Sequence, residues 1–295
     1  IANRAIAPKM KFLRKYTMEN EGQWCVVACP NAVWAKKVFP DLEEEAAVEA
    51  LWEAILNASR VTEDNDPVLE WNKHNEALSS RNQKLNDYNF VSLHFKNSLG
   101  TDLEIGLVDN PIWAGDGEHS KKYVYFNPNI PTEENFCMPH NKKINGRVVA
   151  TMPLNYAGKL IEDFYLDFKD GKVVAYDAKK EVEALKSLIE FDEGSSSLGE
   201  VALISHNSPI SNMNILFYNT LFDENASCHL ALGSAYTSTN LKDGEKYTEA
   251  ELDEVGCNQS NTHVDFMFGS SDMEVTGTTH DGQIIQVFKN GNFVF

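Results

Sequence analysis

The chain has 295 residues, of which 42% are hydrophobic and 11% aromatic, a composition typical of a folded globular protein and not of a disordered one. Its 26 Lys and Arg residues against 44 Asp and Glu residues give a formal net charge of −18, which disfavours a nucleic-acid partner because binding to phosphate backbones depends mainly on Lys and Arg. No run approaches the roughly 18 apolar residues of a membrane helix, so we expect no membrane partner.

Five widely spaced cysteines lack the pattern of a disulfide framework and favour the reducing cytoplasm as the location of the protein. No charged segment followed by an apolar one opens the chain, so a secretory signal is not predicted. The chain begins at Ile1 rather than Met, which indicates a truncated or processed form. The basic stretch at 9–15 is short and interrupted, and we interpret it as a solvated terminal segment.

The first third of the chain is predicted to be helical after a short lead-in. A buried strand is expected at 24–29. One helix is expected to begin at Asp41, where Asp41 and Glu44 resemble a capping box. A second helix is expected from Pro67 to about Lys84, because proline fits the first turn of a helix.

From about Phe90 the pattern changes to short alternating strands separated by turn residues. The predicted strands lie at 91–96, 102–108, 123–126, 147–152, 160–168, 172–176, 201–204, 215–218, 264–268, 284–287 and 292–295, with a helix at 180–189. Residues 91–96 and 102–108 are expected to pair as a hairpin, and Asp170-Gly171 to make a tight turn. Residues 192–197 are expected to form an exposed loop. Because helices come first and strands follow, we predict the α+β class, with a helical first third and a mixed or antiparallel, barrel-like sheet.

Residues 261–269 carry a histidine and an aspartate two positions apart on a predicted strand. Successive side chains of a strand point to opposite faces, so His263, Asp265 and Met267 share one face while the other face is entirely apolar. Two such ligands can reach one metal ion without rearrangement of the backbone. The alternative is a polar strand edge that faces solvent.

Three other segments carry candidate ligands. His229 stands between small residues and an apolar run, which indicates a buried imidazole held either by a hydrogen bond or by a metal. Glu200 begins an apolar strand, where burying a carboxylate is unfavourable in free energy unless it is paired or coordinated. Glu133 and Glu134 follow a proline turn, and a double glutamate in a loop is usually just solvated. Cys228 is interpreted as a small buried residue.

Taken together, these segments resemble the aminopeptidase T and aminopeptidase S family of metallopeptidases. The matching stretches are Pro-Thr-Glu-Glu at 131–134, Leu-Gly-Glu-Val-Ala-Leu at 198–203, the segment 219–233 with Asp-Glu-Asn-Ala-Ser-Cys-His inside it, Tyr236, and 263–270. Similarity at 24–41 and 93–102 extends the resemblance along nearly the whole chain. Members normally carry a further α/β segment ahead of the point where this chain begins, which agrees with a truncated form. Asn135 and Cys137 depart from the residues expected after the glutamate pair.

The resemblance implies cleavage of single residues from peptide N-termini, by water or hydroxide activated by two divalent ions, zinc or cobalt. The implied metal ligands are Glu134, Glu200, Glu224, His229, His263 and Asp265. Glu200 and Tyr236 are the implied catalytic residues, Glu200 as a bridge between the ions or a proton shuttle and Tyr236 as a hydrogen-bond donor to the oxyanion.

The same resemblance implies a domain organisation and partners. Residues 1–88 are expected to be the remainder of an N-terminal α/β region, and 89–295 a strand-rich, metal-binding catalytic domain. The expected partners are a peptide substrate with a free N-terminus and a second copy of the chain in a homodimer.

Two alternatives stay open. An iron(II)-dependent β-barrel oxygenase would use His263 and Asp265 in a two-histidine, one-carboxylate triad. Only His280 follows them, next to a predicted turn, and the other candidate ligands would be left unexplained. The second alternative is a catalytically inactive, truncated protein that binds peptides.

Overall fold

The computed structural model describes residues 16–17 and 20–295, so the basic stretch at 9–15 lies outside the described residues. Its helices are α3 (Ala32–Val38), α4 (Glu44–Ala58), α5 (Pro67–Tyr88), α6 (Val182–Ile189), α7 (Pro209–Met213), α8 (Thr220–Asp223), α9 (Thr237–Asn240) and α10 (Glu249–Glu254). Its strands are β1 (Ser92–Lys96), β2 (Asp102–Leu107), β3 (Glu118–His119), β4 (Tyr125–Phe126), β5 (Asn135–Cys137), β6 (Pro139–Val149), β7 (Leu154–Tyr156), β8 (Lys159–Lys169), β9 (Lys172–Lys180), β10 (Leu198–Leu203), β11 (His229–Gly233), β12 (His263–Met267), β13 (Glu274–Thr278), β14 (Ile284–Lys289) and β15 (Asn292–Phe293).

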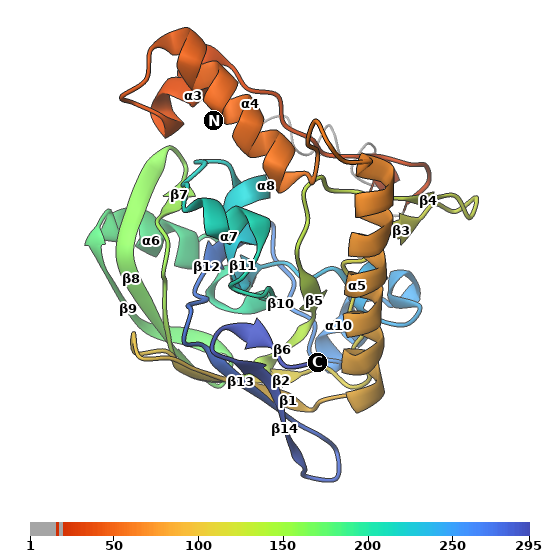
Figure 1. Cartoon of the computed structure of the whole chain (residues 1–295). Helices are drawn as coiled ribbons and strands as arrows, with labels where there is room; N and C mark the ends of the chain where they lie inside the picture. Colours follow the sequence, from red (N-terminus) through yellow and green to blue (C-terminus); the bar gives the residue numbers. More distant parts are fainter. Residues whose placement is uncertain (1–15, 18–19) are drawn as a thin grey trace.

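The larger sheet runs in the order β15-β14-β13-β1-β2-β6-β8-β7, and β9 pairs with β8. All its pairings are antiparallel. Asp170 and Gly171 both have positive φ and make the tight turn between the long strands β8 and β9, as the sequence predicts. The helical first part and the antiparallel remainder confirm the α+β class (Figure 1).

The smaller sheet has the order β12-β11-β10-β5 and is the element that carries the candidate site. One of its faces packs on the larger sheet: Phe266 of β12 lies 5.7 Å from Phe164 of β8, and Phe268 lies 5.2 Å from Phe95 of β1, measured between ring centroids. The apolar face predicted for 264–268 is therefore the face that enters the main core. The opposite face is left for polar side chains.

The helices of the first third pack on the edge strand β5 of the smaller sheet and on the helices α7 and α8 that connect β10 to β11. α3 and α4 share a second hydrophobic core with α7 and α8, in which Leu51 and Ile55 pack with Phe217 and Phe222. α5 runs beside β5 along the edge of the sheet (Figure 1). Its N-cap is Asp66, whose carboxylate accepts two backbone N–H groups, and Pro67 occupies the first turn as predicted.

Several sequence-based predictions are wrong in detail. Residues 24–29 form no strand beyond an isolated bridge between Val26 and Asn129, because the segment lies along the 128–130 loop and Val27 remains exposed. No capping box begins at Asp41, since α3 occupies the preceding residues and α4 begins after Glu43, whose side chain makes no cap hydrogen bond.

Three further corrections concern the strand-rich part. Residues 215–218 connect α7 to α8, and the apolar signal there comes from Phe217, which is buried in the second core. The predicted exposed loop at 192–197 is a compact turn in which Asp192 accepts the N–H groups of Gly194 and Ser195, and Ser195 is fully buried. No sheet among the described residues is closed, so the predicted barrel-like shape is not observed.

Among residues 16–17 and 20–295, no helix is long and apolar enough to cross a membrane. The division into 1–88 and 89–295 stays a prediction.

Candidate metal centre

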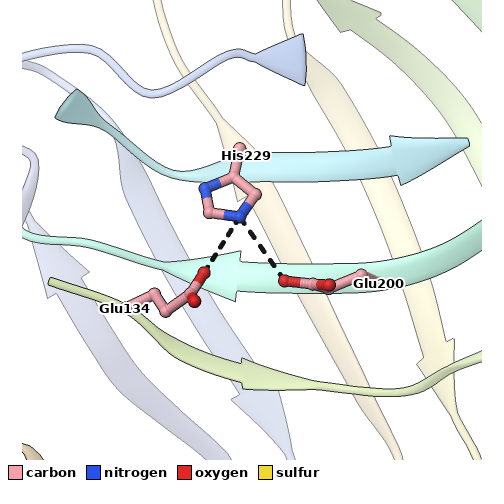
Figure 2. A group of neighbouring side chains, drawn as sticks. All are labelled: Glu134, Glu200 and His229. Atoms are coloured by element: carbon pink, nitrogen blue, oxygen red, sulfur yellow. Dashed lines mark ion pairs between the residues drawn. The ribbon is translucent and has the colours of Figure 1, made fainter. Parts of the chain in front are cut away.

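The polar face of the smaller sheet brings together three residues from neighbouring strands. His229 opens β11, Glu200 lies in β10, and Glu134 immediately precedes β5 (Figure 2). The Nε2 atom of His229 lies 3.1 Å from a carboxylate oxygen of Glu134 and 3.4 Å from Oε1 of Glu200. All three side chains are buried, so these groups meet away from solvent.

A second group of ligands shares Glu200 with the first. The other carboxylate oxygen of Glu200 lies 3.4 Å from Nε2 of His263, and that same nitrogen lies 3.2 Å from Oδ1 of Asp265. Glu200 thus presents one oxygen to each histidine. Two neighbouring donor sets, each able to surround a cation, are joined by one carboxylate.

Glu200 reaches this face because β10 is irregular. In a regular strand Leu198 and Glu200 would point the same way, but the register against β11 shifts between them. The shift lets Leu198 and Val201 both enter the main core while Glu200 faces the site. Gly199 occupies the irregularity, where any Cβ would lie about 2.3 Å from the carbonyl oxygen of Ser234.

Both histidines have their ring orientation set by a backbone carbonyl. The Nδ1 atom of His229 lies 2.8 Å from the carbonyl oxygen of Glu224, and Nδ1 of His263 lies 2.7 Å from that of Ser234. A carbonyl only accepts, so each ring donates from Nδ1 and turns Nε2 toward the carboxylates. This is the usual arrangement of metal-binding histidines, in which the second nitrogen is held by an outer partner.

The charges of the site depend strongly on one another. Burial lowers the pKa of His229, but the carboxylates of Glu134 and Glu200 outweigh it and hold that pKa well above the usual value. Asp265 and Glu200 have the same effect on the pKa of His263. Burial raises the pKa of Glu200, yet the two histidines lower it to about 2, so Glu200 is ionised.

Glu224 and Tyr236 complete the walls of the same cavity, which has a volume of about 150 Å³. Burial, Asp265 and Glu134 raise the pKa of Glu224 well above its usual value. The ring of Tyr236 lies 4.7 Å from that of His263, and burial with the neighbouring carboxylates raises its pKa, which keeps its hydroxyl protonated. The seven residues singled out from the sequence all line this cavity: Glu134, Glu200, Glu224, His229, Tyr236, His263 and Asp265.

Residues of the N-terminal segment and of β3 also line the cavity, which sequence reasoning missed. Asn20, Trp24 and Glu118 line the cavity. The Nδ2 group of Asn20 donates to Glu118 over 3.1 Å, and the Trp24 indole donates to Asn20 over 3.0 Å. Asn20 and Trp24 are near neighbours in the chain, but Glu118 lies about 100 positions away from them, and only the fold brings it beside them.

Other sequence interpretations can be placed as well. Cys228 is buried, and burial raises the pKa of its thiol to about 11, in agreement with a packing role. His94, within the segment 93–102 that resembles the family, pairs with Asp102 on the exposed surface of the hairpin, 2.7 Å apart, and does not line the cavity. Asn135 is buried, and its amide donates to α5.

The donor atoms fit a divalent cation. Two ligands on one tetrahedral zinc ion are separated by about 3.3 Å, given bonds of about 2.0–2.1 Å. The separations of 3.1 to 3.4 Å between each Nε2 and its carboxylates agree with that value. No lysine or arginine occurs among the described residues that line the cavity, so within that lining only the two imidazoles offset the carboxylate charge. The fold and the cavity define an α+β metalloprotein.

Comparisons with known proteins agree with this class. The family model of the thermophilic metalloproteases (M29) matches residues 1–293. Aminopeptidase 2 of Geobacillus stearothermophilus is 45% identical over 100% of this chain and 70% of its own length. Aminopeptidase AmpS of Bacillus subtilis (strain 168) is 46% identical over 99% of this chain and 70% of its own length. The solved structure of wild-type AmpT from Thermus thermophilus superposes with a TM-score of 0.90 at 39% identity, covering 98% of this chain and 69% of that one.

The chain belongs to the thermophilic metalloprotease (M29) family. The resemblance inferred from the sequence is confirmed, and so is the prediction of a metal-dependent aminopeptidase, a hydrolase that acts on peptides. A divalent metal cofactor follows from the same membership and from the two donor sets.

Proposed function

We propose that this aminopeptidase removes single residues from peptide N-termini with two divalent ions, zinc or cobalt, bound by the two donor sets that share Glu200. Glu134, Glu200 and His229 would hold one ion, while Glu200, His263 and Asp265 would hold the other, with Glu224 as a further ligand. The observation that carries the proposal is the position of Glu200, which presents one oxygen to each histidine.

When bound, such an ion pair supplies an activated water and polarises the scissile carbonyl. Glu200 lies between the two donor sets, and a carboxylate oxygen of Glu200 that no ion engaged could take the proton of the attacking water. Tyr236 keeps its proton and can donate it in a hydrogen bond to the oxyanion. The acidic walls favour a substrate whose N-terminal amine is free and charged.

Chelation provides the direct test. We expect hydrolysis of an amino-acid p-nitroanilide to disappear after dialysis against a chelator and to return when Zn²⁺ or Co²⁺ is added. Metal analysis of the purified chain should give two ions per chain. Activity that survives complete removal of metal, or a single ion in the fully active protein, would contradict the proposal.

Tyr236→Phe tests the donor role. We expect kcat to fall by about 10²–10³-fold, with little change in KM and in metal content, because the hydroxyl contributes mainly when charge develops on the oxygen. Tyr247→Phe is the matched control, since Tyr247 is exposed and does not line the cavity. Equal activity of Tyr236→Phe and the control would remove Tyr236 from the mechanism.

The remaining expectations keep their status as predictions. The homodimer and the cytoplasmic location rest on the sequence alone.

A further inference from the structure

The segment that carries Glu134 is anchored from the side opposite the cavity. Glu134 lines the cavity and the adjacent Glu133 does not, so the two side chains leave the backbone on different sides. The Glu133 carboxylate accepts two hydrogen bonds from Arg60, over 2.5 Å and 2.8 Å. Arg60 lies just after the C-terminus of α4, so this contact joins a helical element to the ligand segment.

The helix α5 bonds the same segment on both sides of Glu134. The ring of His74 donates from Nε2 to the carbonyl oxygen of Thr132 over 2.7 Å. The amide of Asn135 donates to the carbonyl oxygen of Leu78 over 3.0 Å and to the side chain of Asn82 over 2.7 Å. Residues spaced by four lie on one face of a helix, so a single edge of α5 holds the segment.

A third contact couples this segment to the other ligand of the same donor set. The backbone N–H of Glu133 donates to the side chain of Asn225 over 2.7 Å. Asn225 follows Glu224, whose carbonyl oxygen orients the ring of His229. Residue 133 thus connects the positions of Glu134 and His229.

The Arg60–Glu133 pair is well placed to maintain this geometry. The side chain of Arg60 is 17% exposed and that of Glu133 is 7% exposed, so water screens the pair little. A forked guanidinium–carboxylate contact is directional, and removing Arg60 takes both of its hydrogen bonds from the buried Glu133 carboxylate, leaving the charge of Arg81 to act on it without an ion pair. Neither Arg60 nor Glu133 lines the cavity, so their influence on it must pass through the backbone.

We propose that Arg60 is a positioning residue: by its forked contact with Glu133 it holds the 132–135 backbone in place and aims the Glu134 carboxylate at the ion shared with His229. This inference rests on the proposed function, because it takes Glu134 as a metal ligand. It assigns the helical first third a direct part in building the metal centre.

The test is Arg60→Met, which keeps a long unbranched side chain but removes the guanidinium and both of its hydrogen bonds to Glu133. Full-length protein, stripped of metal, is titrated with Co²⁺ and followed by calorimetry and by the visible absorption of the bound ion. We expect affinity at one of the two sites to fall by about 10–100-fold, the range typical for loss of a partner behind a metal ligand. The site formed by His263 and Asp265 should be unchanged. Arg60→Lys should recover only part of the loss, because a lysine cannot form the fork.

Arg147→Met is the matched control. Arg147 makes the same forked contact with Asp167, over 2.6 Å and 2.7 Å, but on the exposed surface of the larger sheet. We expect its Co²⁺ binding at both sites to equal that of the unmodified protein. If Arg60→Met does not fold, Glu133→Gln replaces it, since this change keeps the size of the side chain and weakens the same contact.

Each result is decisive. Unchanged binding at both sites in a folded Arg60→Met or Glu133→Gln protein overturns the positioning role, as does an equal loss in Arg147→Met. Failure of the unmodified protein to bind two ions would instead overturn the proposed function, so the two failures are distinguishable.

Discussion

His229→Ala is expected to lower kcat/KM for an amino-acid p-nitroanilide by more than about 100-fold. Losing a residue that only supports a metal ligand typically costs about 10–100-fold, and His229 is proposed as a ligand itself. The imidazole is almost fully buried and is the nitrogen donor that Glu134 and Glu200 both face. Without it those two buried carboxylates lose their common partner. Metal content, measured as ions per chain, should fall together with activity while the circular dichroism spectrum stays that of a folded protein.

His140→Ala serves as the control for that variant. His140 lies on β6 and does not line the cavity; its Nδ1 accepts the backbone N–H of Lys142. We expect activity and metal content close to those of the unmodified protein. Normal activity of His229→Ala would count against the metal centre, and a large loss in His140→Ala would show that the segment around Glu134 is wrongly placed.

Glu200→Gln is expected to weaken metal binding more than His229→Ala does, because both donor sets use the side chain of Glu200. An amide of the same size offers a weaker ligand and no negative charge, and it cannot accept the proton of the attacking water. We expect both ions to be bound more weakly and kcat/KM to fall on the order of 10³-fold, two losses of about 10–100-fold combined.

The matched control for this change is Glu162→Gln. Glu162 pairs with Lys180 on the larger sheet, 2.8 Å apart, and does not line the cavity. Its activity and its two-ion stoichiometry should be unaffected. If Glu200→Gln retained two ions and the activity of the control, Glu200 would have neither the bridging nor the proton-accepting role.

Much of the local structure could be predicted from the sequence, since it depends on near neighbours in the chain. Alternation at 263–268 correctly placed His263 and Asp265 on one face and Phe266 on the other. Turn chemistry correctly predicted the β1–β2 hairpin and the Asp170-Gly171 turn. Short apolar runs were less informative: 24–29 and 215–218 are not strands, because periodicity cannot separate a strand from an irregular segment with one buried side chain.

The candidate site was identified from the sequence only in its components. A buried histidine can be held by an ordinary hydrogen bond, and a buried carboxylate by an ordinary ion pair, so neither residue alone indicated a metal. Resemblance to a family was needed to combine them into one site. The signal that was missed is in α5, where the polar residues His74 and Asn82 lie on the same face as the apolar Leu78. Both polar side chains are buried there and bond the segment of Glu134.

The amino-acid sequence by itself determined which side chains are available and which face of each strand they occupy, because both depend on residue type and on the two-residue period of a strand. Tertiary structure decided everything that depends on distance across the chain. The shifted register at Gly199 turns Glu200 toward both histidines, and the pairing of β5, β10, β11 and β12 places donors from four segments within reach of one another. The register of these pairings is set by burial of the apolar face of the whole sheet. That face is built from segments far apart in the chain, so no short stretch of sequence determines it.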